Sequence, residues 1–101
     1  MPFPTLSLES WTLERYKVVK LLAKAFAIEI LQALNEAPLR FVDLKDHCPN
    51  DRTRALRLKE LRKIGFIIAT VKEIENHSYV HYQITEKGRR ALQLLNELEK
   101  L

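Results

Sequence analysis

Residues 50–65, NDRTRALRLKELRKIG, constrain the fold of this chain more than any other stretch. Asn50 is a favourable N-cap and Gly65 is a favourable residue just past a C-terminus, so residues 51–64 are predicted to form a helix. Between Arg52 and Lys63 this helix has one acid, Glu60, and six bases, which are Arg52, Arg54, Arg57, Lys59, Arg62 and Lys63. Six bases and one acid give +5, whereas the whole chain, with 17 bases and 13 acids, has a net charge of +4. The positive charge is therefore concentrated here, which indicates an anionic partner.

The segments around this basic helix predict a helix-turn-helix followed by a β-hairpin. Before it, apolar side chains three or four positions apart predict a short helix over 41–48, and a Pro-Asn pair forms the turn. After it, residues 66–74 are rich in β-branched side chains, residues 75–78 form a polar tip, and residues 79–85 alternate between polar and apolar. A short helix, a tight turn and a basic helix form a helix-turn-helix unit, and the hairpin is the wing of a winged helix.

Helical patterns at both ends of the chain extend this unit. Apolar spacing predicts two helices separated by a break near 23–25, with Pro38 ending the second, and Thr85 caps a final leucine-rich helix. The expected fold class is α+β and mostly α, a winged helix-turn-helix with a β-hairpin wing and additional N- and C-terminal helices. Residues 1–101 are predicted to be one domain, with the helix-turn-helix at about 41–64, the wing at about 66–85 and terminal helices at 10–23 and 86–101.

Composition argues against several classes of function. The chain contains only two glycines, so a glycine-rich phosphate-binding loop is excluded, and no nucleophile elbow or zinc-hydrolase motif occurs. We therefore expect neither an enzyme nor a cofactor-binding protein. One cysteine cannot form an internal disulfide, and no segment has the pattern of a signal peptide or a membrane span. These features favour a soluble cytoplasmic protein.

Histidine and cysteine side chains raise the question of a metal site. His47 and Cys48 are adjacent, and His77 and His81 share a face of the predicted hairpin. Two histidines and one cysteine can bind zinc, but no CxxC pair accompanies them. The expectation is therefore unrelated histidines and a small buried cysteine, with no metal.

Three segments resemble the HxlR-type winged-helix transcription regulators and the related MarR and ArsR types. They are PLRFVDLKDH, RLKELRKIGFI and YVHYQITEKGRRAL. The most specific part is the joint between the hairpin and the last helix, Tyr82-x-Ile84-Thr85-x-x-Gly88-x-x-x-Leu92. The resemblance covers about residues 20–95 and implies a winged helix that binds DNA and regulates transcription.

The sequence departs from the family pattern at three places. HxlR-type proteins typically have a cysteine near the N-terminus, linked in some members to redox sensing, whereas the cysteine here is Cys48, in the turn. The family's proline-rich wing tip is replaced by ENHS. Arg54 stands where the recognition helix commonly has an apolar residue. These differences concern the sub-family rather than the fold.

The second helix of a helix-turn-helix inserts its N-terminal turns into the major groove, which predicts the side chains that meet DNA. At about 100° per residue, Leu58 and Leu61 define the buried stripe, flanked by Ala55 and Ile64. Candidates for base edges are Arg52, Thr53, Leu56 and Arg57, and candidates for phosphates are Lys59 and Lys63. Asn50 and Arg54 complete the set of DNA-binding candidates on this unit. Arg54 falls near the stripe, so its stem is expected to pack while its head reaches solvent. The alternative is a solvated surface helix.

The wing and the segment before the helix-turn-helix add further candidates for DNA contact. They are Arg40, Lys72, His77 and Ser78. Wings reach a minor groove or the backbone, although Glu73 and Glu75 would repel phosphates. The alternatives are a solvated turn and, for Arg40, an ordinary surface charge.

Apolar residues on the terminal helices exceed what one small core usually covers. They are Trp11, Leu13 and Tyr16 in the first helix and Leu94, Leu95, Leu98 and Leu101 in the last. An exposed surface of this kind usually has a partner, and a two-fold homodimer is the default. The alternative is that the two helices pack only on each other within one chain.

The sequence therefore predicts a dimeric transcription regulator that binds double-stranded DNA sequence-specifically, with helix 51–64 in the major groove. Two other functions stay open. One is a winged helix that serves as a protein-protein interaction module, and the other is a non-specific architectural DNA-binding protein. The concentration of bases in one helix favours DNA.

Overall fold

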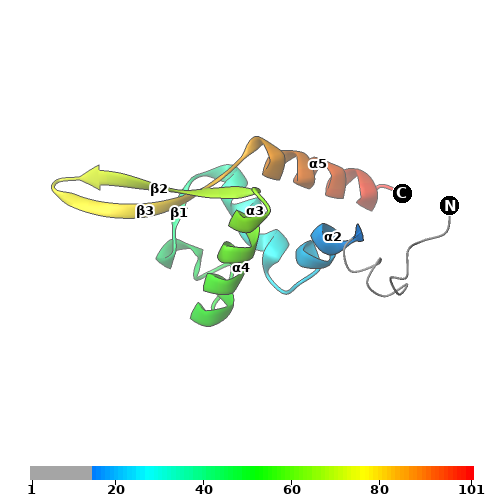
Figure 1. The fold of residues 1–101 in the computed structure, drawn as a ribbon, viewed down its shortest axis with the longest axis horizontal. Helices are drawn as coiled ribbons and strands as arrows, with labels where there is room; N and C mark the ends of the chain where they lie inside the picture. Colours follow the sequence, from blue (N-terminus) through cyan, green and yellow to red (C-terminus); the bar gives the residue numbers. More distant parts are fainter. Residues whose placement is uncertain (1–14) are drawn as a thin grey trace, which may run out of the picture.

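The computed structural model describes residues 15–101, in which helices pack around one end of a long β-hairpin (Figure 1). In chain order the elements are α2 (Lys17–Leu22), α3 (Ala27–Glu36), β1 (Leu39–Arg40), the 3₁₀ helix η1 (Val42–Leu44), α4 (Asp51–Lys63), β2 (Ile67–Ile74), β3 (His77–Ile84) and α5 (Glu86–Glu99). This is the mostly helical winged helix-turn-helix that the sequence predicts.

The N-terminal half confirms the predicted break between two helices. α2 ends at Leu22 and α3 begins at Ala27, while Phe26 between them has a left-handed φ of 69°. α3 ends two residues before Pro38, which cannot continue a helix. Of the predicted helix 10–23, residues 10–14 lie outside the described residues.

The first helix of the helix-turn-helix is shorter than predicted. Instead of a helix over 41–48, only Val42–Leu44 form a 3₁₀ turn, and the chain then bends through Cys48 into Pro49 and Asn50. Backbone carbonyls left over in this segment are bound by a buried arginine side chain, described below. α4 follows as predicted, because Asn50 Oδ1 accepts a hydrogen bond from Thr53 N at 2.9 Å.

The hairpin belongs to a three-stranded antiparallel sheet with the order β1-β3-β2. Its tip is a two-residue turn, because Glu75 and Asn76 both have positive φ, 51° and 68°, as in a type I′ turn. The predicted four-residue tip 75–78 is therefore too long. His77 and Ser78 belong to β3, where they pair with Ile74 and Glu73 of β2.

The joint between the hairpin and α5 depends on a close approach at Gly88. A Cβ atom on Gly88 would lie 2.3 Å from the carbonyl oxygen of Phe66, so no larger residue fits without a shift. Thr85 Oγ1 donates to Gly65 O at 2.6 Å and accepts from Gly88 N at 3.1 Å. These contacts explain why the joint carries a threonine and a glycine three positions apart.

The core lies where α3, α4, α5 and the base of the hairpin meet. Its most deeply buried side chains include Ile30, Leu31, Leu44, Leu58, Leu61 and Ile67. None of the helices in residues 15–101 has the length and hydropathy needed to cross a bilayer.

Candidate nucleic-acid interface

The outward face of α4 carries four of the predicted DNA contacts. Arg52, Leu56, Lys59 and Lys63 are all exposed, as the helical projection predicts. Leu56 keeps 48% of its surface exposed. A large apolar side chain surrounded by basic ones is suited to meet a thymine methyl between phosphate contacts.

Arg54 lies in the core, which corrects the expectation that its head reaches solvent. Only 1% of its surface is exposed. The guanidinium donates to the carbonyl oxygens of Cys48 (2.8 Å), Pro49 (3.1 Å) and Phe41 (3.4 Å). It also lies 4.4 Å from the centroid of the Phe41 ring, and it pairs with Asp51 at 3.0 Å. A buried cation requires such partners, and Arg54 thereby fastens the turn to α4 instead of facing DNA.

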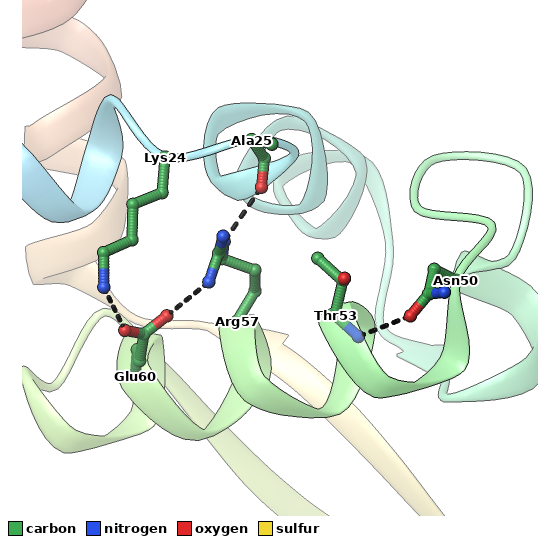
Figure 2. A network of polar contacts seen from close by, with 6 residues as sticks. All are labelled: Lys24, Ala25, Asn50, Thr53, Arg57 and Glu60. Carbon is green, nitrogen blue, oxygen red and sulfur yellow. Dashed lines mark hydrogen bonds and ion pairs between the residues drawn. The ribbon is translucent and has the colours of Figure 1, made fainter.

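Arg57 is also turned inward, contrary to its assignment as a base-reading residue. Its side chain is 13% exposed. Figure 2 shows its Nε donating to Ala25 O and its Nη1 donating to Glu60 Oε1, both at 2.9 Å. Glu60 Oε2 accepts in turn from Lys24 Nζ at 2.5 Å. This network joins the α2–α3 loop to the flank of α4 and fixes how α4 sits on the protein.

The charge state of Glu60 supports this network. Burial by itself would raise the pKa of Glu60, but the hydrogen bonds and charges of Lys24 and Arg57 outweigh it and hold the pKa below the ordinary value of 4.5. Glu60 is therefore ionised at neutral pH. Both cations keep their partner, and neither adds its full charge to the outward face.

The start of α4 is occupied by the helix cap. Asn50 is exposed, and its side-chain oxygen accepts from Thr53 N, as Figure 2 also shows. Thr53 is half-buried on the same flank as Arg57. Asn50 therefore remains at the edge of the outward face, whereas Thr53 is turned partly toward the α2–α3 loop.

Arg62 is a basic residue of the outward face that the sequence assignment of sites left out. It is exposed and lines a groove of about 570 Å³ between α4 and β2, together with Lys59 and Lys63. Placing Arg54 on the buried stripe would have predicted that Arg62 faces outward. With Arg54 in the core, the buried stripe is Arg54, Leu58 and Leu61, which leaves Ala55 and Arg62 on the exposed side.

The strand register brings three wing candidates to one face of the sheet and separates the fourth. Lys72 pairs with Tyr79, His77 pairs with Ile74, and Arg40 pairs with His81, so their side chains share a face. Ser78 pairs with Glu73 and points to the other face. One face of the hairpin is therefore basic and aromatic, whereas the other face bears Glu73.

Arg40 is held in place on that basic face. Its Nε and Nη2 donate to the two carboxylate oxygens of Asp43, each at 3.1 Å, and its guanidinium lies 5.7 Å from the ring centroid of Tyr79. Hydrogen bonds from the Arg40 side chain and backbone lower the pKa of Asp43. The pairing orients Arg40 and offsets part of its charge.

α5 has an apolar face that the core does not cover. Leu94, Leu98 and Leu101 are exposed, with 58% of Leu98 accessible. Leu92 is buried and Leu95 packs against the core, so the predicted leucine stripe is divided between core and surface. Leu95 therefore serves the fold of its own chain rather than an exposed interface.

The N-terminal candidates for the dimer interface are only partly described. Tyr16, just before α2, is exposed, and so is Val19 one turn later. Trp11 and Leu13 lie outside the described residues. Tyr16 and Val19 add a second apolar surface to that of α5.

Cys48 and the histidines belong to no metal-binding group in residues 15–101. Cys48 is fully buried, and this burial raises the pKa of its thiol more than the charges of Arg54 and Arg57 lower it. Within the described residues, no group of three or more His, Cys, Asp or Glu side chains is placed to hold a metal ion.

Comparison with known proteins identifies relatives of this fold. Residues 21–101 match the HxlR-like helix-turn-helix family. The reduced transcriptional regulator YodB of B. subtilis is 26% identical, with a TM-score of 0.74 over 99% of this chain and 90% of that one. The transcriptional repressor BigR of Xylella fastidiosa is 22% identical, with a TM-score of 0.64 over 92% of this chain and 87% of that one, and shares the fold. Sequence comparison with curated proteins gives no significant match.

The fold and its exposed basic helix define a winged helix-turn-helix, a class of DNA-binding transcription regulators that are not enzymes. The family match covers the helix-turn-helix, the wing and α5. The chain therefore belongs to the HxlR-like helix-turn-helix family.

Proposed function

We propose that this protein binds double-stranded DNA sequence-specifically as a homodimer, with α4 in the major groove and the β2–β3 hairpin beside it. The observation that carries the proposal is the outward side of α4, where Leu56 and the bases Arg52, Lys59, Arg62 and Lys63 are all exposed. The two acids of α4 are already paired, Asp51 with Arg54 and Glu60 with Arg57. The outward bases are therefore left for an external anion.

The position of each outward residue along α4 suggests its role. Arg52 and Leu56 lie in the N-terminal turns, which enter the groove, so Arg52 is suited to pair bidentately with guanine and Leu56 to contact thymine. Lys59, Arg62 and Lys63 lie farther along α4, where phosphates are the nearer partners. Asn50 at the helix start adds an amide donor at the edge of the groove.

The hairpin supplies contacts outside the major groove. Its basic face, with Arg40, Lys72 and His77 around Tyr79, suits the sugar-phosphate backbone. Ser78 lies on the opposite face and is not part of the proposed contact. Glu73 and Glu75 limit how closely the tip can approach phosphates.

A salt titration with duplex DNA tests the proposal. Affinity for a random duplex should fall with salt, with a log–log slope of about −0.9 for each phosphate neutralised. Selection from a random DNA pool should then give a preferred site. A protein-protein interaction module would show no salt-dependent DNA binding, and an architectural protein would bind without enriching any sequence.

Dimerisation is proposed through the uncovered apolar faces of α5 and the α2 segment. Leu94, Leu98 and Leu101 with Tyr16 supply apolar surface that a second copy would remove from water. Two recognition helices would then face one side of DNA about 34 Å apart, matching an inverted repeat. We also propose that the protein is located in the cytoplasm, together with the DNA that it binds.

The variant Leu98→Glu tests this interface. A charge placed among apolar neighbours should split the dimer while leaving the helix-turn-helix folded, and affinity for a paired site should fall. Gln93→Glu, which adds the same charge on the polar side of α5, is the matched control and should stay dimeric. Light scattering at micromolar concentration measures the mass. A monomeric parent, or a dimeric Leu98→Glu variant, would contradict the interface.

A further inference from the structure

A second groove runs along α4 on the flank opposite the hairpin. It has a volume of about 700 Å³ and lies between α2, the C-terminal half of α4 and the start of α5. Its apolar floor includes Leu21 and Ile64. Its rim carries five lysines, which are Lys17, Lys20, Lys24, Lys63 and Lys87.

Most of this positive charge has no counter-charge on the protein. Lys24 pairs with Glu60, and Lys87 donates to Ile64 O at 2.8 Å. Lys17, Lys20 and Lys63 are exposed, and their side chains make no hydrogen bond or ion pair with another residue of 15–101. Glu60, the one acid of the rim, already binds two cations. Like charges held together in a concave surface repel one another and attract an anion.

The groove is next to the proposed DNA-binding face. Lys63 lines both this groove and the one between α4 and β2, so a single ridge of α4 separates them. Figure 1 shows α2 on one side of α4 and the hairpin extending from the other. A helix in the major groove has a sugar-phosphate backbone on each of its two sides. The hairpin is placed to contact one backbone, and the lysine groove is placed to contact the other.

We propose that the lysine groove between α2 and α4 binds the DNA backbone on the side of the major groove opposite the hairpin. Lys17 and Lys20 are the main phosphate contacts, because they lie one helical turn apart on α2 with Lys24 following them in the turn. The inference rests on the proposed DNA binding and extends it to α2.

The double variant Lys17→Gln/Lys20→Gln tests this contact. Its affinity for duplex DNA is measured between about 50 and 200 mM salt, where the release of counterions makes affinity strongly dependent on salt. The log–log slope should become shallower by about 0.9 for each lysine removed. Affinity should fall equally for preferred and random sequences, with the largest loss at low salt. Arg90→Gln is the control, because it removes one positive charge at a residue that does not line the groove. Arg90 is exposed on the side of α5 opposite the buried Ala91 and Leu92, so its loss should leave the slope unchanged.

The outcomes separate this inference from the proposed function. If the parent does not bind duplex DNA at low salt, the proposed function fails. If the parent binds, and the double variant keeps the parent's slope and affinity, the lysine groove does not contact the backbone. If the variant instead loses affinity for one sequence only, α2 reads bases and the phosphate assignment is wrong. Circular dichroism should show an unchanged fold, since both lysines are exposed.

Discussion

The two sides of α4 use arginine for opposite purposes. On the inner side, Arg54 and Arg57 donate hydrogen bonds to backbone carbonyls, and Arg57 also donates to Glu60. On the outer side, Arg52 and Arg62 are exposed. A count of six bases on α4 therefore overstates the positive charge that is available to an external anion, because Arg54 and Arg57 bind groups within the protein.

Arg54 supplies donors that the backbone of the short helix-turn-helix turn lacks. The turn passes through Pro49 and contains no glycine, and several of its carbonyls have no helical partner. Arg54 supplies the missing donors from inside α4, and the Phe41 ring covers its guanidinium. An apolar residue at this position would pack but could not bind those carbonyls. The same side chain type thus stabilises the motif on one face of the helix and faces solvent on the other.

The largest expected effect is loss of stability in Arg54→Ala. The change opens a cavity and leaves buried carbonyls, such as that of Cys48, without a donor, so unfolding should become easier by about 3–5 kcal/mol. Urea unfolding followed by circular dichroism measures it. Arg52→Ala, an arginine-to-alanine change on the outer face, should alter stability by no more than about 0.5 kcal/mol. Equal stability of the two variants would remove the distinction between the faces.

Sequence periodicity predicted the elements but not the exact rotation of α4. Leu58 and Leu61 marked the buried stripe correctly, and Asn50, Gly65 and Thr85 marked the helix boundaries. The projection placed Arg54 near the stripe, but a charged head is expected to reach solvent, so the projection could not predict that the guanidinium lies in the core. The cost of burying that cation depends on carbonyls up to 13 residues earlier in the chain, at Phe41, which no local pattern reveals.

On the outer face, we expect a loss of DNA recognition without a loss of stability. Arg52→Ala should cost about 1–3 kcal/mol in affinity and relax the preference at one base position. Lys63→Ala should weaken binding to all sequences alike and make the salt slope shallower by about 0.9. Binding titrations on the preferred site and on single-base variants of it measure both effects. Uniform losses in both variants would show that α4 does not read bases in the proposed register.

Arg57 lies between the two sides and allows a sharper test. Arg57→Ala loses the bonds to Ala25 O and Glu60, so stability should fall by about 1–2 kcal/mol while base preference stays the same. Arg57→Lys keeps the charge but not the forked geometry, and should recover only part of the stability. Thermal or urea unfolding and DNA selection are compared for both variants. A changed base preference in Arg57→Ala with unchanged stability would mean that Arg57 reaches DNA.

The candidate site was less predictable than the fold because it depends on how distant segments meet. Lys17, Lys20 and Lys24 are spaced for one helix face, yet only the packing of α2 beside α4 makes them the rim of a groove with Lys63. In the wing, the two-residue turn at Glu75 and Asn76 sets the register. A shift of one residue would exchange the faces of the hairpin, so a longer assumed tip grouped Ser78 with side chains that point the other way.

The smallest expected effect is a dependence of stability on acid pH through Glu60. Its pKa is lowered in the folded protein by Lys24 and Arg57 against the effect of burial, so the ionised carboxylate stabilises the fold above its ordinary pKa of 4.5. That contribution is lost as pH falls through the lower folded pKa. Glu60→Gln lacks this contribution. Its free energy of unfolding should be lower than that of the parent by about 1 kcal/mol or less at pH near 7, and the difference should disappear in acid.

Urea unfolding at neutral pH and at several pH values below about 4 measures this difference for parent and variant. Asp43, whose pKa is also lowered, titrates equally in both proteins and cancels. Glu99→Gln is the control, because Glu99 is exposed at the end of α5 and has no ion pair within residues 15–101. A difference for Glu60→Gln that stays constant from neutral to acid pH would mean that the carboxylate is not the link between Lys24 and Arg57. The polar contact between α4 and the α2–α3 loop would then depend on the Arg57–Ala25 bond.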